Sequence, residues 1–175
     1  MANGMDRRRF LTTTGAAAAG AALGPLVPGP RAYSAEPITV GFVSIFSGRV
    51  ASLGETGYRG LELALDEINA AGGLLGRQVK AIRQDSAGKI EDAVRIAREL
   101  ITRDKVTVLM DHSSSREAFA VREVSRDLKM VTMATASETT ELTADPKART
   151  PYTFRAARQT LHDGIVAGNY AAGLA

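Results

Sequence analysis

Short runs of apolar and β-branched residues alternate along the chain from residue 38 with longer segments in which apolar residues recur every three or four positions. The short runs predict β-strands and the longer segments predict helices. The strand-like runs are residues 38–45, 79–83, 106–110, 130–134 and 152–154. The run 106–110 is almost continuously apolar, which predicts a strand buried on both faces, whereas the more polar run 79–83 is expected near a sheet edge.

A segment with helical periodicity follows each strand-like run. Leu61, Leu65 and Ile68 lie on one face of a predicted helix that ends at Gly72 and Gly73. Further helices are expected over residues 90–101 and 119–128, around Glu141, and from about Thr160 onward. This alternation predicts an α/β fold with a doubly wound parallel sheet.

Ligands of such folds bind beyond the carboxyl ends of the strands, so the loops 44–54, 111–116 and 135–141 are the candidate binding loops. Ser113 begins a serine triplet where a strand passes into a helix, and free amides at a helix start favour a carboxylate. Ser114 and Glu117 also fit a capping box, and one helix start can serve both roles.

The other two loops supply further candidates. Ala136, Ser137 and Glu138 follow the fourth strand, where backbone groups can meet a small polar ligand. Ser47 and Gly48 after the first strand form a predicted tight turn, which is either structural or part of the site.

The first 35 residues have the three regions of an export signal. A twin-arginine head at residues 7–11 precedes an alanine-rich apolar run at 15–26, and prolines and small residues follow. We expect export by the twin-arginine pathway to the periplasm, with cleavage near Ser34 and Ala35. Removing these residues takes the formal net charge from +3 to zero, which leaves no electrostatic case for nucleic acid.

Residue types that carry catalysis or bind cofactors are sparse. The chain has no cysteine, and His112 and His162 have no partners at metal-ligand spacing. Neither a phosphate-binding glycine motif nor a nucleophile motif occurs. The sequence therefore predicts a binding protein without a cofactor or metal, not an enzyme.

The motifs taken together resemble the opening of the type I periplasmic binding proteins of the leucine-isoleucine-valine class, the substrate-binding proteins of ABC transporters. The residues that carry the resemblance are 38–41, 47–48, Gly54, Gly60, 66–73, Gly76, 85–86, 113–115, 141–143 and 152–155. They span essentially all of residues 38–160. The resemblance implies a two-lobed, monomeric receptor that closes on an amino acid, amide or organic acid and delivers it to a membrane permease.

The resemblance also assigns roles to residues. In that class the residue at the position of Ser113 holds the ligand's carboxylate, and those at positions 136 and 138 hold its amino group. This sequence departs from the pattern, because Glu138 replaces a threonine and Leu53 stands where an aromatic ring is frequent. A carboxylate at position 138 would repel a ligand carboxylate unless Glu138 turns away or pairs with Arg116.

The resemblance further implies a division of the chain. Residues 36–156 would form an incomplete first lobe and residues 157–175 the start of a second, so we expect a truncated chain. Two alternatives stay open: a periplasmic sensor or auxiliary receptor of the same fold, and an exported oxidoreductase, which the twin-arginine signal allows.

Overall fold

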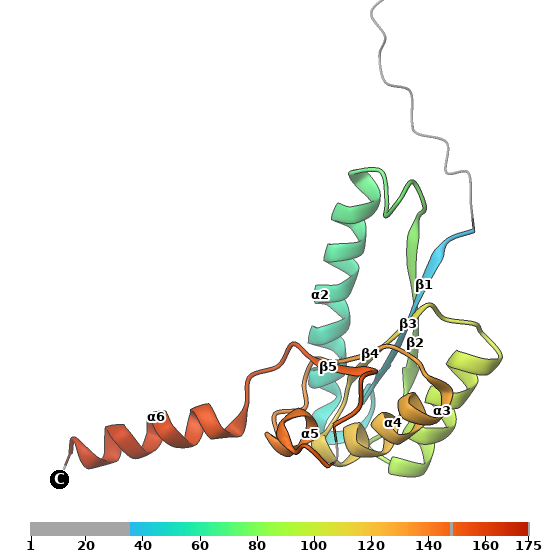
Figure 1. The fold of residues 1–175 in the computed structure, drawn as a ribbon. Coiled ribbons are helices and arrows are strands. Elements are labelled where there is room, and N and C mark those ends of the chain that lie inside the picture. The colour runs from blue at the N-terminus through green and yellow to red at the C-terminus, as the bar shows by residue number, and fades with distance from the viewer. Residues whose placement is uncertain (1–35, 148, 175) are drawn as a thin grey trace, which may run out of the picture. The chain divides into compact units, whose positions relative to one another are not determined.

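The core of the protein is a sheet of five parallel strands in the order β2-β1-β3-β4-β5 (Figure 1). The computed structural model describes residues 36–147 and 149–174, so the predicted export signal lies outside the described residues. The strands are β1 (Ile38–Ser44), β2 (Val79–Asp85), β3 (Val108–His112), β4 (Thr132–Ala134) and β5 (Thr153–Arg155). The parallel sheet is confirmed, and β2 lies at an edge as its polar pattern predicts.

Helices cover both faces of the sheet, as a doubly wound fold requires. One face packs on α2 (Ala51–Ala70), which follows the 3-10 helix η1 (Gly48–Val50), and the other packs on α3 (Ile90–Thr102) and α4 (Ser115–Leu128) (Figure 1). The short α5 (Glu141–Ala144) and the final α6 (Thr160–Ala172) complete the elements. Because β1 leads to α2 and its neighbour β3 leads to α4, the chain leaves the sheet toward opposite faces at these adjacent strands.

The alternation of side chains along the strands divides the core into two apolar layers. Val40 faces α2 and packs with Leu65, whereas Val43 and Leu109 face α3 and α4. At Gly41 a Cβ atom would lie only 3.2 Å from the side chain of Leu100 in α3, so glycine at this position lets α3 and the sheet approach closely.

The third strand begins and ends two residues later than the apolar run predicts. Lys105 has a φ of 53° and turns the chain, and the ladder then continues through Asp111 and His112, which pair with Val43 and Ser44. The polar character of these two residues indicated a loop, and that boundary was wrong. A strand can carry polar residues at a buried end when their hydrogen bonds are made.

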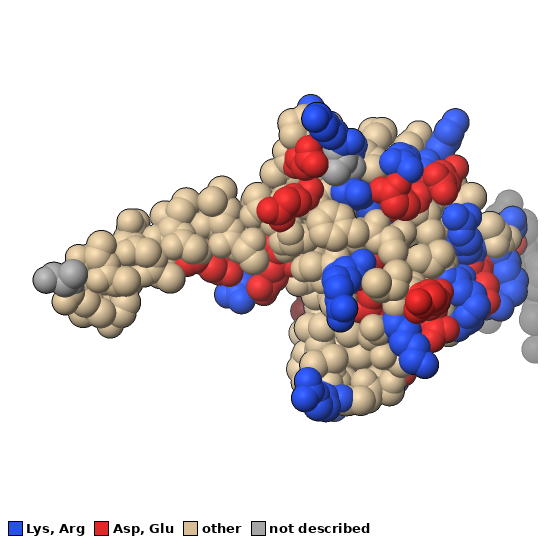
Figure 2. Space-filling model, turned by 90° about the horizontal axis from the view of Figure 1, so that it is seen from below, with Lys and Arg blue, Asp and Glu red and all other residues tan. Residues whose placement is uncertain are grey.

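Charged side chains are unevenly distributed over the surface. Figure 2 shows basic and acidic residues interspersed over the sheet-bearing part, whereas α6 has a mainly uncharged surface. Every residue of α6 is exposed, and its large apolar residues Leu161, Ile165, Val166 and Tyr170 are each more than half exposed. In the described structure α6 therefore adds no buried residue to the core of the sheet.

Candidate functional site

The carboxyl ends of β1, β3 and β4 lie next to one another in the sheet, and hydrogen bonds join the loops that follow them. Thr135 after β4 donates from its amide to the Asp111 carbonyl, 2.9 Å away. The Ser44 hydroxyl at the end of β1 donates to the carbonyl of His112. The three candidate loops thus meet beyond the carboxyl ends of β1, β3 and β4, called the carboxyl edge below, where the topology places a ligand site.

Ser113 and Asp111 form a buried pair at the centre of this edge. Each residue is only 1% exposed, and the Ser113 hydroxyl donates to the Asp111 carboxylate. Burial raises the pKa of Asp111 to about 7, against the lowering effect of its hydrogen bond from Ser113, and the charge of Glu117 adds to the rise. The hydroxyl proton of Ser113 therefore points into the protein.

The predicted capping box at the start of α4 is confirmed. The carboxylate of Glu117 accepts hydrogen bonds from the Ser114 hydroxyl at 2.6 Å and the Ser114 amide at 3.2 Å. Its other oxygen accepts from the hydroxyl of Ser86, which is fully buried, as is Glu117 itself. The cap is therefore part of a buried network that reaches across to the end of β2.

The loop after β4 is held by an arginine that the sequence reasoning missed. Arg155 in β5 donates to the carbonyl of Ser137 at 2.7 Å and to the carbonyl of Thr139. Ser137 is 1% exposed, and its hydroxyl donates to the Ser115 hydroxyl over 3.4 Å. The candidates Ala136 and Ser137 are thus placed beside the serine triplet. The sequence indicated Arg155 only through its position in the motif at residues 152–155.

Glu138 pairs with Arg158 and not with Arg116. The Glu138 carboxylate lies 2.9 Å from the Arg158 guanidinium, and its backbone carbonyl accepts from the amide of Thr160. The Arg158 side chain is 66% exposed and the Glu138 side chain 41%. The carboxylate is therefore directed toward the segment that precedes α6.

Ser47 and Leu53 lie beyond the carboxyl end of β1, on one side of the candidate site. Ser47 is exposed, and its hydroxyl bonds to Asp85, whose carboxylate also accepts from the amide of Phe46. Leu53 is half-buried in the first turn of α2, where it lines a shallow pocket with its neighbours Arg49, Val50, Ser52 and Thr56.

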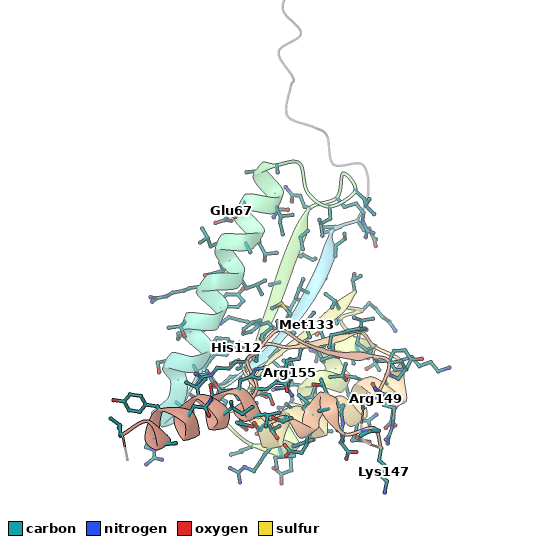
Figure 3. The ribbon with its side chains drawn as sticks, turned by 60° about the vertical axis from the view of Figure 1, so that its left-hand side comes forward. Glu67, His112, Met133, Lys147, Arg149 and Arg155 are labelled. Atoms are coloured by element: carbon teal, nitrogen blue, oxygen red, sulfur yellow. The ribbon has the colours of Figure 1, made fainter. Side chains whose placement is uncertain are left out.

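His112 connects the β1 side to the serine triplet. Its ring stacks on Phe42, its Nδ1 lies 2.8 Å from the Thr135 hydroxyl, and it bonds to the backbone of Leu53. Figure 3 shows His112 between the sheet and the first turns of α2. Burial lowers the pKa of this imidazole, which favours the neutral form. The histidine is a packing residue that fixes the start of α2 against β3.

Within residues 36–147 and 149–174, histidines and acidic residues do not gather in a group that could hold a metal ion. Over the same ranges, each helix is too short or too polar to cross a membrane.

Comparison with known proteins places the chain in context. The family model described as a periplasmic binding protein matches residues 37–174. The chain is 28% identical over 144 residues to an amino acid binding protein of Pseudomonas aeruginosa, which covers 82% of this chain and 38% of that protein.

Solved structures show the same relationship. An ABC transporter substrate-binding protein from Sphaerobacter thermophilus is 41% identical with a TM-score of 0.64, covering 68% of this chain and 32% of that one. A branched-chain amino acid transporter substrate-binding protein from Streptococcus pneumoniae, solved with isoleucine, is 27% identical with a TM-score of 0.64, covering 70% and 34%. The matched region thus spans about a third of the length of these relatives.

Proposed function

Because the chain belongs to the periplasmic binding protein family, we propose that it forms part of an extracytoplasmic receptor that captures a small organic ligand and delivers it to the permease of an ABC importer. The ligand classes that we propose are amino acids, amides and related organic acids. Since the matched region covers only 38% and 32% of two of these relatives, the proposal concerns the whole receptor, to which this chain contributes one side of the site.

The observation that carries the proposal is the convergence of three loops at the switch point of the sheet. The hydrogen bonds from Thr135 to Asp111 and from Ser44 to His112 hold the ends of these strands and their loops together. We propose that Ser113, Ser114, Ala136, Ser137 and Glu138 form the β3 and β4 side of the pocket, and that Ser47 and Leu53 form the β1 side. Such a preformed edge of small and hydroxyl residues suits a small polar ligand.

We further propose that residues 36–156 belong to the first lobe and residues 157–175 begin the second. The full exposure of α6 supports this division, because a helix with Leu161, Ile165 and Tyr170 on its surface has apolar area to bury against other elements. The receptor is proposed to be monomeric.

Export by the twin-arginine pathway is the proposed route to the periplasm. Its support is the sequence Arg7-Arg8-Arg9-Phe10-Leu11 before the alanine-rich run. Replacing Arg7 and Arg8 by lysine should leave precursor in the cytoplasm, as seen by fractionation and immunoblotting. A periplasmic mature form at the wild-type level would show that another route is used.

A thermal-shift screen of the full gene product tests the receptor function. The screen uses branched-chain amino acids, their amides and small organic acids, and a true ligand at a hundred times its Kd should raise the free energy of unfolding by about 2.7 kcal/mol. A saturable shift with one ligand series supports the function. No shift with any compound in the screen speaks against it.

Two serine variants locate the ligand. Ser113→Ala lies in the proposed pocket, whereas Ser125→Ala removes an equally buried hydroxyl that bonds to Thr132 at the opposite end of α4. We expect the first variant to change ligand affinity by about tenfold or more, because a partner of the head group is lost. The second should lower stability and leave the affinity unchanged, and equal effects on affinity would place the ligand elsewhere.

A further inference from the structure

The serine triplet directs its first two hydroxyl protons into the protein. Ser113 donates to Asp111, and Ser114 donates to Glu117. Both acceptors are buried carboxylates, with Asp111 at 1% and Glu117 at 0% exposure. A hydroxyl has one proton, so neither serine can also donate to a ligand while it keeps this bond.

The two carboxylates also make the local charge negative. Among the described residues, neither Asp111 nor Glu117 forms an ion pair with a lysine or arginine, and the charged group that acts on Asp111 is Glu117 itself. The start of α4 offers roughly half a positive charge through its dipole. Up to two negative charges beside it outweigh that half charge, and the Glu117 carboxylate also accepts from the N-cap amide of Ser114.

We propose that Asp111 is a positioning residue that sets the ligand class of this pocket: the head group that binds at the turn between β3 and α4 is an uncharged or cationic N–H donor, a carboxamide or an amine, and not a carboxylate. The inference rests on the receptor function proposed above. It replaces the role that family resemblance alone gives to Ser113, because the sequence motif does not show the direction of the hydroxyl.

The chemistry follows from the hydrogen bond between Ser113 and Asp111. With its proton given to an ionised Asp111, the Ser113 oxygen presents lone pairs, which accept from an N–H group. An ionised carboxylate behind this oxygen strengthens its attraction for a donor and repels an anionic head group. When Asp111 is protonated it can donate to Ser113 instead, and the serine proton is then free for an anion.

The test compares ligands that share one side chain and differ in the head group. Isovaleramide, isoamylamine and isovalerate are titrated into the full gene product by calorimetry, together with leucinamide and leucine. The first three keep their head-group charge between pH 6 and 8, since carboxyl groups titrate well below and alkylamines well above this range. The α-amino group of leucinamide titrates at about pH 8, so the comparison between the two pH values uses the first three probes alone. At pH 8 the amide or the amine should bind at least about tenfold more tightly than the matched carboxylate.

Two further measurements assign the preference to Asp111. Asp111→Asn should reduce the ratio of the isovaleramide affinity to the isovalerate affinity by about tenfold. Asp104→Asn, which removes a partly exposed carboxylate before the opposite end of β3, should leave this ratio unchanged. The wild-type protein offers a test without mutation, because the ratio should fall between pH 8 and pH 6 as Asp111 takes up its proton.

The outcomes separate this inference from the receptor function. Tighter binding of isovalerate or leucine than of the amides overturns the inference and keeps the function. A preference for amides that neither Asp111→Asn nor pH alters overturns the role of Asp111. Failure of all five probes, and of the wider screen, overturns both the inference and the function.

Discussion

The side-chain amide of Asn69 pairs with the backbone of Val79 through two hydrogen bonds, each 2.8 Å long. The Asn69 Nδ2 donates to the Val79 carbonyl, and the Val79 amide donates to the Asn69 Oδ1. The last turn of α2 is thereby fixed to the first residue of β2. Asn69 belongs to the motif at residues 66–73, so this part of the family resemblance has a structural cause.

Asn69→Ala should lower the free energy of unfolding by about 2 kcal/mol, because two backbone groups beside the buried Val79 lose their partner. Asn69→Asp is the matched control. Its carboxylate can still accept from the Val79 amide but faces the carbonyl with a second acceptor, so it should be nearly as destabilising at pH 7. The loss of unfolding free energy in Asn69→Asp should shrink below pH 4, where a protonated carboxyl can donate to the Val79 carbonyl. Urea unfolding at pH 7 and below pH 4 measures this loss. A neutral Asn69→Ala would contradict the assigned role.

Gly57 and Gly60 predict opposite effects of the same substitution within α2. A Cβ at Gly57 would lie 2.3 Å from Nε2 of His112, a ring held by Phe42 and Thr135, whereas a Cβ at Gly60 meets nothing within 4 Å. Gly57→Ala should therefore destabilise the protein by about 1 to 3 kcal/mol through overpacking. Gly60→Ala should stabilise it by up to about 1 kcal/mol through helix propensity.

Thermal melts of the two glycine variants check this pair of expectations. Adding His112→Ala should relieve the defect of Gly57→Ala, since the clashing ring is then absent. If Gly57→Ala is as stable as Gly60→Ala, the close contact of α2 with β3 is not maintained in solution.

Asp85 should stabilise the loop after β1 through its carboxylate. Oδ1 accepts from the amides of Phe46 and Ala87, both at 2.8 Å. Burial opposes ionisation of this carboxyl, but the two amides, the Ser47 hydroxyl and the charge of Arg83 together outweigh it and lower the pKa from 3.8. Asp85→Ala should cost about 2 kcal/mol, and Asp85→Asn, which keeps the accepting oxygen, should cost less.

The pH dependence gives a second readout for Asp85. A lowered pKa means that the stabilisation is present above pH 3.8 and is lost as the pH falls through the lower pKa of the folded state. The difference in unfolding free energy between wild type and Asp85→Ala should therefore narrow below pH 4. A difference that stays constant from pH 7 to pH 3 would show that the carboxylate charge contributes nothing.

Asp111 should give the opposite dependence of the unfolding free energy on pH. Its pKa is about 7 in the folded protein against 3.8 ordinarily, so the folded state holds a proton that the unfolded state releases between these values. Stability should fall as the pH rises from about 4 to about 7, by up to about 4 kcal/mol for a three-unit difference, and then level off. Denaturant unfolding at pH 5 and pH 8 should show most of this loss in wild type and not in Asp111→Asn. Equal losses in both proteins would mean that Asp111 ionises freely in the fold.

The order and type of the elements could be read from the sequence. The alternation of strand-like and helical periods predicts a parallel sheet, because each strand is followed by a helix that covers a face, and the polar pattern of residues 79–83 predicts an edge strand. The capping box at Ser114 and Glu117 was equally predictable, since it depends on residues three positions apart in one helix turn. Local chemistry decides all of these features.

The candidate site could be located but not described. Parallel strands bring their carboxyl ends to one edge, which places the loops after β1, β3 and β4 together. The partners of their side chains depend on contacts between residues far apart in the chain: Ser86 reaches Glu117, Arg155 reaches Ser137, and Arg158 reaches Glu138. These pairs could not be inferred from the periodicity or the spacing of residues in the sequence.

The direction of the Ser113 hydroxyl separates what the sequence determines from what the tertiary structure decides. The sequence by itself determined that a serine triplet begins a helix at the binding edge, because strand, turn and cap signals are local. Only the tertiary structure decided that Asp111 continues the strand with its carboxylate buried, and that Ser113 donates to it. Burial is a property of the packed sheet and its helices, and it is burial that changes the charge and hydrogen-bonding capacity of this carboxyl.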